Sequence, residues 1–341
     1  MELDSAAVIL VTGGAGYIGS HVVRQLTEAG HKVVVYDNLS TGFADALLHG
    51  ETLVIADLSD TVTLSDVFRE YRIKAVLHFA ASTAVPDSVE NPLKYYFNNT
   101  RNTLNLLQAC VRQGVGQFIF SSTAAVYGLT ESGFAAEDSL TSPISPYGSS
   151  KLMSEQILKD TASAHGMRYA ILRYFNVAGA DPQARIGQRT PAATHLIQVC
   201  CQVALGMRDK VEIFGTDYAT QDGTGVRDYI HVEDLARAHL AAVDYLDRGT
   251  PSVTLNVGYG TGTSVREVIA MAQRISGVNF PVVESPRRSG DPAILVANAD
   301  RIRQTLAWKS SHARLEDIVA DAWRWERKLQ GITRQRGDRG R

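Results

Sequence analysis

A glycine-rich turn near the start of the chain constrains the fold more than any other feature. The apolar run at residues 8–11 predicts a buried strand, and residues 17–29 have the pattern of a helix. Gly13, Gly16 and Gly19 lie at this junction. Their spacing allows a tight turn, a close approach of the backbone to a pyrophosphate and close packing of the helix on the sheet. We expect a dinucleotide to bind at this turn.

An acidic residue after the second predicted strand narrows the choice of dinucleotide. The run at residues 32–36 has the composition of a strand and ends directly before Asp37. A carboxylate at this position can bind the adenosine ribose hydroxyls, and its charge would repel a 2′-phosphate. The sequence therefore predicts NAD in preference to NADP.

The first half of the chain alternates between strand-like and helix-like segments. Strands are expected at residues 8–11, 32–36, 52–55, 75–79, 117–121 and 168–172, and helices at 17–29, 62–71, 92–113 and 145–165. This alternation predicts an α/β fold with a Rossmann-type, doubly wound parallel sheet, covered by helices on both faces. A ligand is then expected across the carboxyl ends of the strands.

The pattern becomes less regular after about Asn176. We expect an NAD-binding domain at residues 1–175 and a smaller C-terminal α/β lobe at 176–330 that binds the substrate. A helix-like run at 232–246 and a strand-like run at 253–257 indicate that residues 228–260 return to the first domain. Residues 331–341, which are rich in arginine, are expected to form a disordered basic tail.

Composition argues against several other classes of protein. The 341 residues include 34 basic and 36 acidic ones, mixed throughout, so no nucleic-acid or membrane partner is expected. No apolar run approaches the ~20 residues of a membrane span, and the N-terminus has no signal-like pattern. Cys110, Cys200 and Cys201 lack the spacing of metal ligands. We therefore expect a cytoplasmic protein with free, buried thiols and no metal.

Tyr147 and Lys151 form the candidate catalytic pair. Their spacing places both side chains on one face of the helix expected at 145–165. The charge of the lysine favours the phenolate, so that a group with an ordinary pKa of about 10 becomes a base near neutrality. The same spacing occurs by chance on solvated helices, so the pair indicates a catalytic site only in combination with the dinucleotide turn upstream.

Several segments together give the chain a resemblance to a known family. They are residues 11–21, 36–39, 78–81, 120–128, the Tyr147 and Lys151 pair, and residues 172–176 and 222–232. With them, the chain resembles the extended short-chain dehydrogenase/reductases over about residues 7–330, and among these the sugar-nucleotide 4-epimerases. The string at residues 223–232 is the most specific to the epimerases.

The resemblance implies roles for individual residues. Tyr147 would be the general base and acid, Lys151 its electrostatic partner and a ribose ligand, and Thr123 the hydroxyl that bonds the 4-oxygen of the sugar. Contacts with NAD would come from Gly13, Gly16, Tyr17, Ile18, Gly19, Asp37, Asn38, Asp57, Leu58, Phe79, Ala80, Ala81, Asn98, Lys151 and Tyr174. Contacts with a UDP-hexose would come from Thr123, Tyr147, Asn176, His195, Leu196, Phe214, Arg227, Arg288, Asp291 and Leu295.

The implied activity is an inversion at carbon 4 that interconverts UDP-glucose and UDP-galactose through a transient 4-keto sugar, with tightly bound NAD. N-acetylated, pentose or uronate UDP-sugars stay open as alternative substrates. A 4,6-dehydratase is less favoured, because it needs an additional acid and base where this chain has Ala124 and Ala125. A dinucleotide sensor without turnover is also less favoured, because such proteins usually lack the tyrosine or the lysine.

Two positions depart from the family pattern. Many bacterial members carry a lysine near the dinucleotide phosphates, in the loop where this chain has Ala81, Ser82, Thr83 and Ala84. Thr83 can offer a phosphate a hydroxyl but no charge. Leu295 stands where members restricted to glucose and galactose often have tyrosine, so we expect room for an N-acetyl group.

Apolar residues on two predicted helices favour a homodimer. In the family, the helices that correspond to residues 92–113 and 145–165 build a four-helix bundle between subunits. Here they carry apolar residues on more than one face, namely Leu104, Leu107, Leu152, Ile157 and Leu158. One of these faces is also compatible with ordinary core packing.

Overall fold

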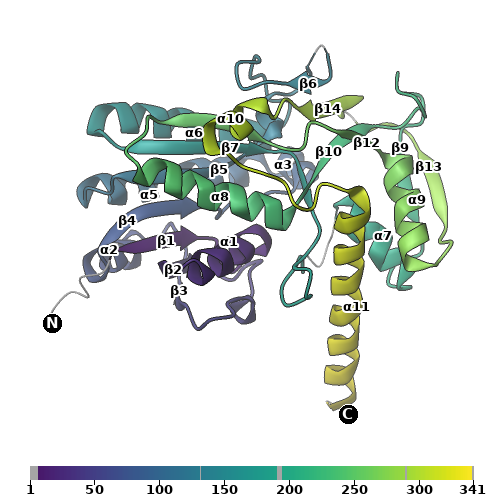
Figure 1. Cartoon of the computed structure of the whole chain (residues 1–341), viewed down its shortest axis with the longest axis horizontal. Helices are drawn as coiled ribbons and strands as arrows, with labels where there is room; N and C mark the ends of the chain where they lie inside the picture. Colours follow the sequence, from purple (N-terminus) through teal and green to yellow (C-terminus); the bar gives the residue numbers. More distant parts are fainter. Residues whose placement is uncertain (1–6, 131, 190–193, 289, 340–341) are drawn as a thin grey trace.

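A parallel sheet forms the centre of the molecule (Figure 1). The computed structural model describes residues 7–339 except 131, 190–193 and 289. Within these residues, seven strands pair in parallel in the order β3-β2-β1-β4-β5-β7-β11. They are β1 (Val8–Thr12), β2 (Lys32–Asp37), β3 (Thr52–Ile55), β4 (Ile73–His78), β5 (Gln117–Thr123), β7 (Arg168–Tyr174) and β11 (Val253–Val257). The predicted Rossmann-type α/β fold is confirmed.

The strands expected in the first half of the chain are all present. Their bounds agree with the prediction to within two residues at either end. All five residues of β1 are buried, as expected for a strand with helices on both sides. The strand order reverses direction between β1 and β4, which is where a doubly wound sheet opens a crevice for a ligand.

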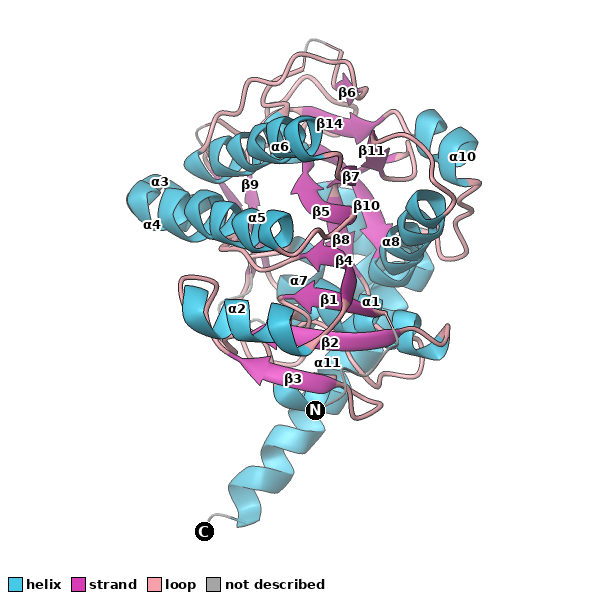
Figure 2. Cartoon of the chain, turned by 90° about the vertical axis from the view of Figure 1, so that its left-hand side faces the viewer, coloured by secondary structure: helices cyan, strands magenta, loops and turns pink. Residues whose placement is uncertain are grey.

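Helices cover both faces of this sheet (Figure 2). α1 (Tyr17–Glu28) and α8 (Val232–Asp247) lie on one face, and α2 (Thr61–Glu70), α5 (Asn102–Arg112) and α6 (Pro146–His165) on the other. Local sequence fixes the ends of α6. The Ser145 hydroxyl accepts a hydrogen bond from the Gly148 N–H, Pro146 occupies the first turn, and Gly166 ends the helix with φ of 68°.

The helix expected at residues 92–113 is divided in three. α3 (Val85–Glu90) precedes α4 (Pro92–Tyr95), the π-helical turn η2 (Tyr96–Arg101) follows, and α5 completes the run. Asn99, within the π-helical turn, accepts a hydrogen bond from the Ser82 N–H at 2.8 Å and donates to the Ser82 carbonyl at 3.0 Å. The wider turn thus joins this helix to the loop after β4. Short 3₁₀ turns, η1 (Ala44–Ala46) and η3 (Ala124–Val126), follow β2 and β5.

The second half of the chain adds a smaller α/β lobe beside the sheet (Figure 1). β10 (Val226–His231) pairs with β8 (Asn176–Ala178), β12 (Gly262–Ser264) and β14 (Ile294–Ala297), and β14 also pairs with β6 (Phe134–Ala135). β9 (Val211–Phe214) pairs with β13 (Val282–Ser285). The helices of this part are α7 (Leu196–Ala204), α9 (Val265–Ser276) and α11 (Leu315–Arg339), whereas α10 (Asp300–Leu306) packs against β11 and α8.

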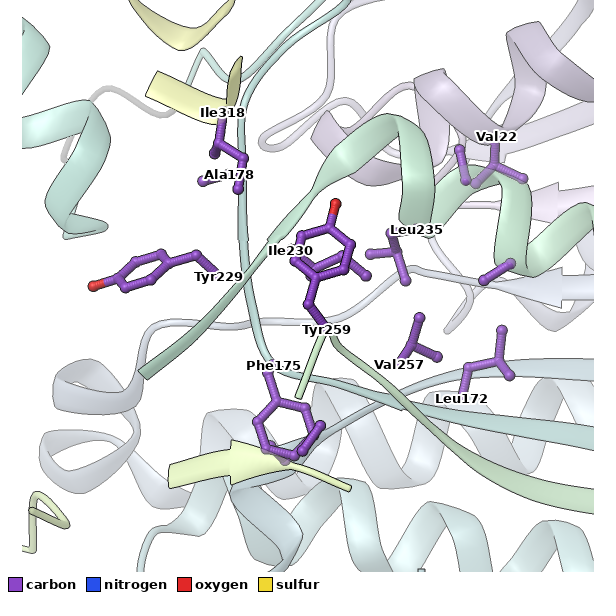
Figure 3. Packing of buried hydrophobic residues seen from close by; sticks show 14 of the residues in the cluster. Val22, Leu172, Phe175, Ala178, Tyr229, Ile230, Leu235, Val257, Tyr259 and Ile318 are labelled. Carbon is purple, nitrogen blue, oxygen red and sulfur yellow. The ribbon is translucent and has the colours of Figure 1, made fainter. Parts of the chain in front are cut away.

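One apolar core crosses from the sheet into the lobe. Figure 3 shows Leu172 and Val257 of the sheet in the same cluster as Tyr229 of β10, and Ile318 of α11 next to Ala178. Because this packing is continuous, the boundary at residue 176 stays a prediction. No helix within the described residues has both the length and the apolar composition needed to cross a membrane.

The basic C-terminal segment requires a correction. We expected disorder from residue 331, but α11 continues to Arg339, and residues 340 and 341 lie outside the described part. Arginine and glutamine have high helix propensity. Extending an existing helix also avoids the cost of nucleation, which the composition-based prediction ignored.

Candidate functional site

A cavity of about 1060 Å³ lies at the carboxyl ends of the central strands and reaches into the small lobe. Its lining includes the glycine-rich turn after β1, the ends of β2, β4 and β5, and residues of β8, β10 and β14. The cavity thus occupies the crevice that the reversal of strand order creates. Its size suits a large ligand or two adjoining ones.

The structure brings most of the predicted site residues together around this cavity. The lining residues from the dinucleotide set are Gly13, Gly16, Tyr17, Ile18, Gly19, Asp37, Asn38, Asp57, Leu58, Phe79, Ala80, Ala81, Asn98 and Tyr174. Those from the UDP-sugar set are Thr123, Tyr147, Asn176, His195, Arg227, Asp291 and Leu295. Lys151, Leu196, Phe214 and Arg288 are not among the lining residues.

The glycine-rich turn fits a dinucleotide because it leaves no room for side chains. Gly13 has φ of 73°, and a Cβ on it would lie 2.5 Å from the Ala80 nitrogen. A Cβ on Gly19 would lie 2.2 Å from the carbonyl oxygen of Gly13. The Asp37 carboxylate accepts hydrogen bonds from the backbone N–H groups of Ala15 at 2.9 Å and Leu39 at 2.8 Å. Each of its oxygens still has a lone pair for a ribose hydroxyl.

Tyr147 lies in the first turn of α6 and bonds to Thr123 at the end of β5. The Thr123 oxygen accepts a hydrogen bond from the Ala125 N–H at 3.1 Å, so its own proton is available to the phenol. Burial raises the pKa of Tyr147, and the hydrogen bond with Thr123 lowers it in part. The expectation of a base near neutrality is therefore not met by the chain alone, because desolvation outweighs the bond.

Lys151 extends from α6 to the Phe120 ring of β5. Its Nζ lies 4.3 Å from the centroid of the Phe120 ring, and the side chain is buried. Burial lowers the pKa of Lys151 to about 7, against a smaller upward effect of Glu155. That carboxylate is already engaged with Arg173 at 2.6 Å and Ser122 at 2.5 Å. Lys151 is thus a buried amine poised to change charge near neutrality.

A neutral histidine lies close to this lysine. His78 Nδ1 lies 2.7 Å from the Thr12 hydroxyl, and His78 Nε2 lies 2.9 Å from that of Thr103. Since Thr103 donates its proton to the Asn99 carbonyl, it accepts from Nε2, and this fixes the tautomer. Burial, and secondarily the charge of Lys151, lowers the pKa of His78 to about 3.

Cationic and apolar groups line the lobe side of the cavity. Arg227 donates to Asp291 at 2.6 Å, and Leu295 is its partner in the pairing of β10 with β14. His195 Nδ1 accepts from Gln188 at 2.7 Å, and burial lowers the pKa of His195. The Arg288 guanidinium carbon lies 3.6 Å from the Phe214 ring centroid, so these two predicted residues contact each other instead of the cavity.

Sequence reasoning missed Asn99. Its carboxamide donates to the Ser150 hydroxyl at 3.0 Å, beside Lys151, as well as to the Ser82 carbonyl. It therefore holds the loop after β4 against α6. A regular helix would turn Asn99 elsewhere, and no sequence pattern predicts a π-helical turn.

Within the described residues, His231, His312 and Asp321 are close enough to hold a metal ion. They do not line the cavity. His231 Nδ1 accepts the Glu233 N–H at 3.1 Å, so its Nε2 carries the proton and faces Asp321 at 3.3 Å. This arrangement does not suit metal ligation, because a protonated Nε2 has no lone pair to offer a metal ion. Cys110, Cys200 and Cys201 are free and buried.

The fold, the glycine-rich crevice and the Tyr147–Thr123 contact define a dinucleotide-dependent enzyme of the short-chain dehydrogenase type. Residues 9–258 match the NAD dependent epimerase/dehydratase family, and the chain belongs to this family. The resemblance noted from the sequence is confirmed.

Three relatives illustrate the similarity. A UDP-glucose 4-epimerase of Azospirillum brasilense is 54% identical over 97% of this chain and 95% of its own length. The crystal structure of a UDP-glucose 4-epimerase from Brucella ovis in complex with NAD is 42% identical, with a TM-score of 0.91 over 94% of this chain and 99% of that one. A UDP-Glc/GlcNAc 4-epimerase of Campylobacter jejuni is 48% identical, with a TM-score of 0.84 over 95% of this chain and 100% of that one.

Proposed function

We propose that the chain is an NAD-dependent 4-epimerase that interconverts UDP-glucose and UDP-galactose. The contact of Tyr147 with Thr123 carries this proposal. Both residues line the same cavity as the glycine-rich turn and Arg227, so a phenol and a hydroxyl lie between the expected dinucleotide and UDP-sugar sites. The names of the relatives support the same activity. The free, buried cysteines are consistent with the cytoplasm as the site of action.

When bound, NAD supplies the acceptor and donor of the hydride at carbon 4. The chain supplies the proton chemistry. Thr123 holds the 4-oxygen, and Tyr147 Oη takes the proton of the 4-hydroxyl and later returns it. A cation near the phenol offsets the rise in the Tyr147 pKa that burial causes. Lys151 provides this charge only while it is protonated.

The structure supports an epimerase over a dehydratase. Elimination of water across carbons 5 and 6 requires an additional acid and base beside the sugar. Ala124 and Ala125 line the cavity directly after Thr123, and neither can transfer a proton. The chain therefore has the groups for oxidation and reduction at carbon 4 without those for elimination.

Leu295 supports a broader choice of sugar. It lines the cavity, is shorter than tyrosine and has no hydroxyl to place there. The Campylobacter jejuni relative carries both UDP-Glc and GlcNAc in its name. We therefore include UDP-N-acetylglucosamine and UDP-N-acetylgalactosamine among the proposed substrates.

A homodimer is part of the proposal. Leu107 and Leu158 are buried in the core of one chain, whereas Leu104 and Met153 are 39% and 47% exposed. With Tyr96 and Ile157, the two exposed residues line an apolar groove of about 420 Å³ across η2, α5 and α6. A second copy of this chain, packed through the same face, would cover the groove symmetrically.

One incubation tests the proposed activity. Purified protein is mixed with UDP-glucose without added cofactor, and the products are separated by chromatography. UDP-galactose is the expected product. A 4-keto-6-deoxy sugar would indicate a dehydratase, and unchanged UDP-glucose even after addition of NAD would contradict the proposal.

A further inference from the structure

One guanidinium group joins three distant parts of the chain at the solvent edge of the cavity. Arg189 donates to Asp45 Oδ1 at 2.6 Å. Its guanidinium carbon lies 4.9 Å from the ring centroid of Phe43 and 5.4 Å from that of Trp325. Phe43 and Asp45 belong to the loop after β2, Arg189 follows β8, and Trp325 belongs to α11.

The two aromatic partners of Arg189 are firmly held. The Phe43 N–H donates to the Ala15 carbonyl at 2.9 Å, so its loop lies against the glycine-rich turn. Trp325 is buried, and its Nε1 donates to the Gln188 carbonyl at 2.7 Å. A Cβ on Gly187 would lie 2.6 Å from Trp325 Cδ1, so the backbone just before Arg189 packs directly against the indole ring. Arg189 thus connects two surfaces that are each held in place by other contacts.

These contacts lie in the wall of the cavity. Phe43, Gln188 and Arg189 all line it, next to Ala15 and Asp37. Asp45 is 57% exposed and Arg189 19%, which places their contact at the outer edge. Separating the loop after β2 from the segment after β8 therefore requires the Arg189 contacts with Phe43 and Asp45 to break.

The charge of Arg189 matters as well as its contacts. Among the described residues, the lysines and arginines that line the cavity are Lys94, Arg189 and Arg227. The loop after β4 also lines the cavity, with Ala81, Ser82 and Thr83, and these residues offer no cation. Arg189 thus adds to the cavity lining a cation whose charge is shared with Asp45.

We propose that Arg189 is a latch that slows the release of the dinucleotide by tying the loop after β2 to the segment after β8. The inference rests on the proposed function, in which the same cofactor takes up and returns the hydride and must stay bound through the cycle. Arg189 is a positioning residue here, since it acts on the closure of the site and not on the reacting atoms. A part-exposed ion pair with two cation–π contacts is worth about a tenfold change in rate.

The dissociation rate of NAD tests the latch. The purified protein is loaded with radiolabelled NAD, chased with unlabelled NAD and sampled by filter binding. Arg189→Ala is expected to release NAD about tenfold faster, and Arg189→Lys to fall between, because it keeps the charge without the planar fork. The matched control is Arg185→Ala, which removes an ion pair with Asp181 on the same segment, outside the cavity lining. Its rate is expected to equal that of the parent.

Two outcomes would overturn the latch. Release by Arg189→Ala within twofold of the parent is one, and equal acceleration by Arg185→Ala, which would indicate a general loosening of the segment, is another. If the parent binds and epimerises but Arg189→Ala releases NAD at the parental rate, the latch alone fails. If the parent retains no labelled NAD, the proposed function fails with it. Thermal unfolding of each variant verifies that it is folded.

Discussion

Replacing Lys151 by methionine is expected to stabilise the cofactor-free protein while it abolishes activity. Burial lowers the pKa of Lys151 from an ordinary value near 10.5 to about 7. Below pH 7 the lysine is protonated in both states, and folding bears the full cost of burying its charge. Between pH 7 and 10.5 the unfolded chain binds one proton more, so stability rises with pH. Methionine has a similar length and carries no charge to bury.

The size of the effect follows from the shift. A pKa lowered from 10.5 to about 7 corresponds to a few kcal/mol at or below pH 7. The change of this stability difference with pH is the better test, because the packing of the methionine side chain contributes equally at every pH. The advantage of Lys151→Met should shrink with pH above pH 7, by about 1.4 kcal/mol per pH unit once the lysine is neutral in the folded state.

Urea unfolding measures this directly. Parent and variant, both stripped of dinucleotide, are compared at pH 6, 7, 8 and 9, so that all other titrating groups cancel at each pH. Lys151→Arg is the control, because an arginine keeps its charge over this range. The difference in unfolding free energy between Lys151→Met and Lys151→Arg should therefore not shrink as the pH rises. An advantage of Lys151→Met that stays constant across the series would refute the assignment of a buried, shifted amine.

Three further predictions concern turnover, specificity and assembly. Tyr147→Phe should lower turnover by at least ~100-fold with NAD binding retained, as measured by steady-state kinetics and filter binding, and turnover within a few-fold of the parent would refute its role as base. Leu295→Tyr should reduce the catalytic efficiency with UDP-N-acetylglucosamine by about 10–100-fold relative to UDP-glucose, since overpacking costs ~1–3 kcal/mol, and an unchanged ratio would show that Leu295 is not the gate. Leu104→Glu should shift the mass by light scattering from dimer to monomer, whereas a monomeric parent at micromolar concentration would contradict the dimer.

The elements of the sheet and the dinucleotide turn were predictable because their signals are local. Gly13 and Asp37 lie where strand, turn and helix follow one another within a few residues, and each position admits few alternatives. The surroundings of Lys151 were not predictable in this way. Its Nζ faces Phe120 because β5 packs under α6, and a helical spacing from Tyr147 says nothing of that neighbour. The sequence alone therefore indicated a charge beside the phenol, whereas burial dominates the pKa of both groups.

The same limit applies to contacts between distant segments. Arg288 and Phe214 both belong to the expected substrate set, yet they stack on each other, a pairing that depends on the two-stranded sheet of β9 and β13. The helical end of α11 was missed for another reason. Composition describes what a free segment prefers and not what an attached helix imposes on it.

The continuous core has a consequence for how the sugar inverts. Because buried side chains interlock across the sheet and the lobe, from Leu172 to Ile318, the two halves cannot swing apart as rigid bodies without exposing that core. Inversion at carbon 4 nevertheless requires both faces of the sugar ring to meet the same hydride position in turn. Since the two halves stay packed together, we expect the hexose itself to turn over in the cavity while its nucleotide end stays bound.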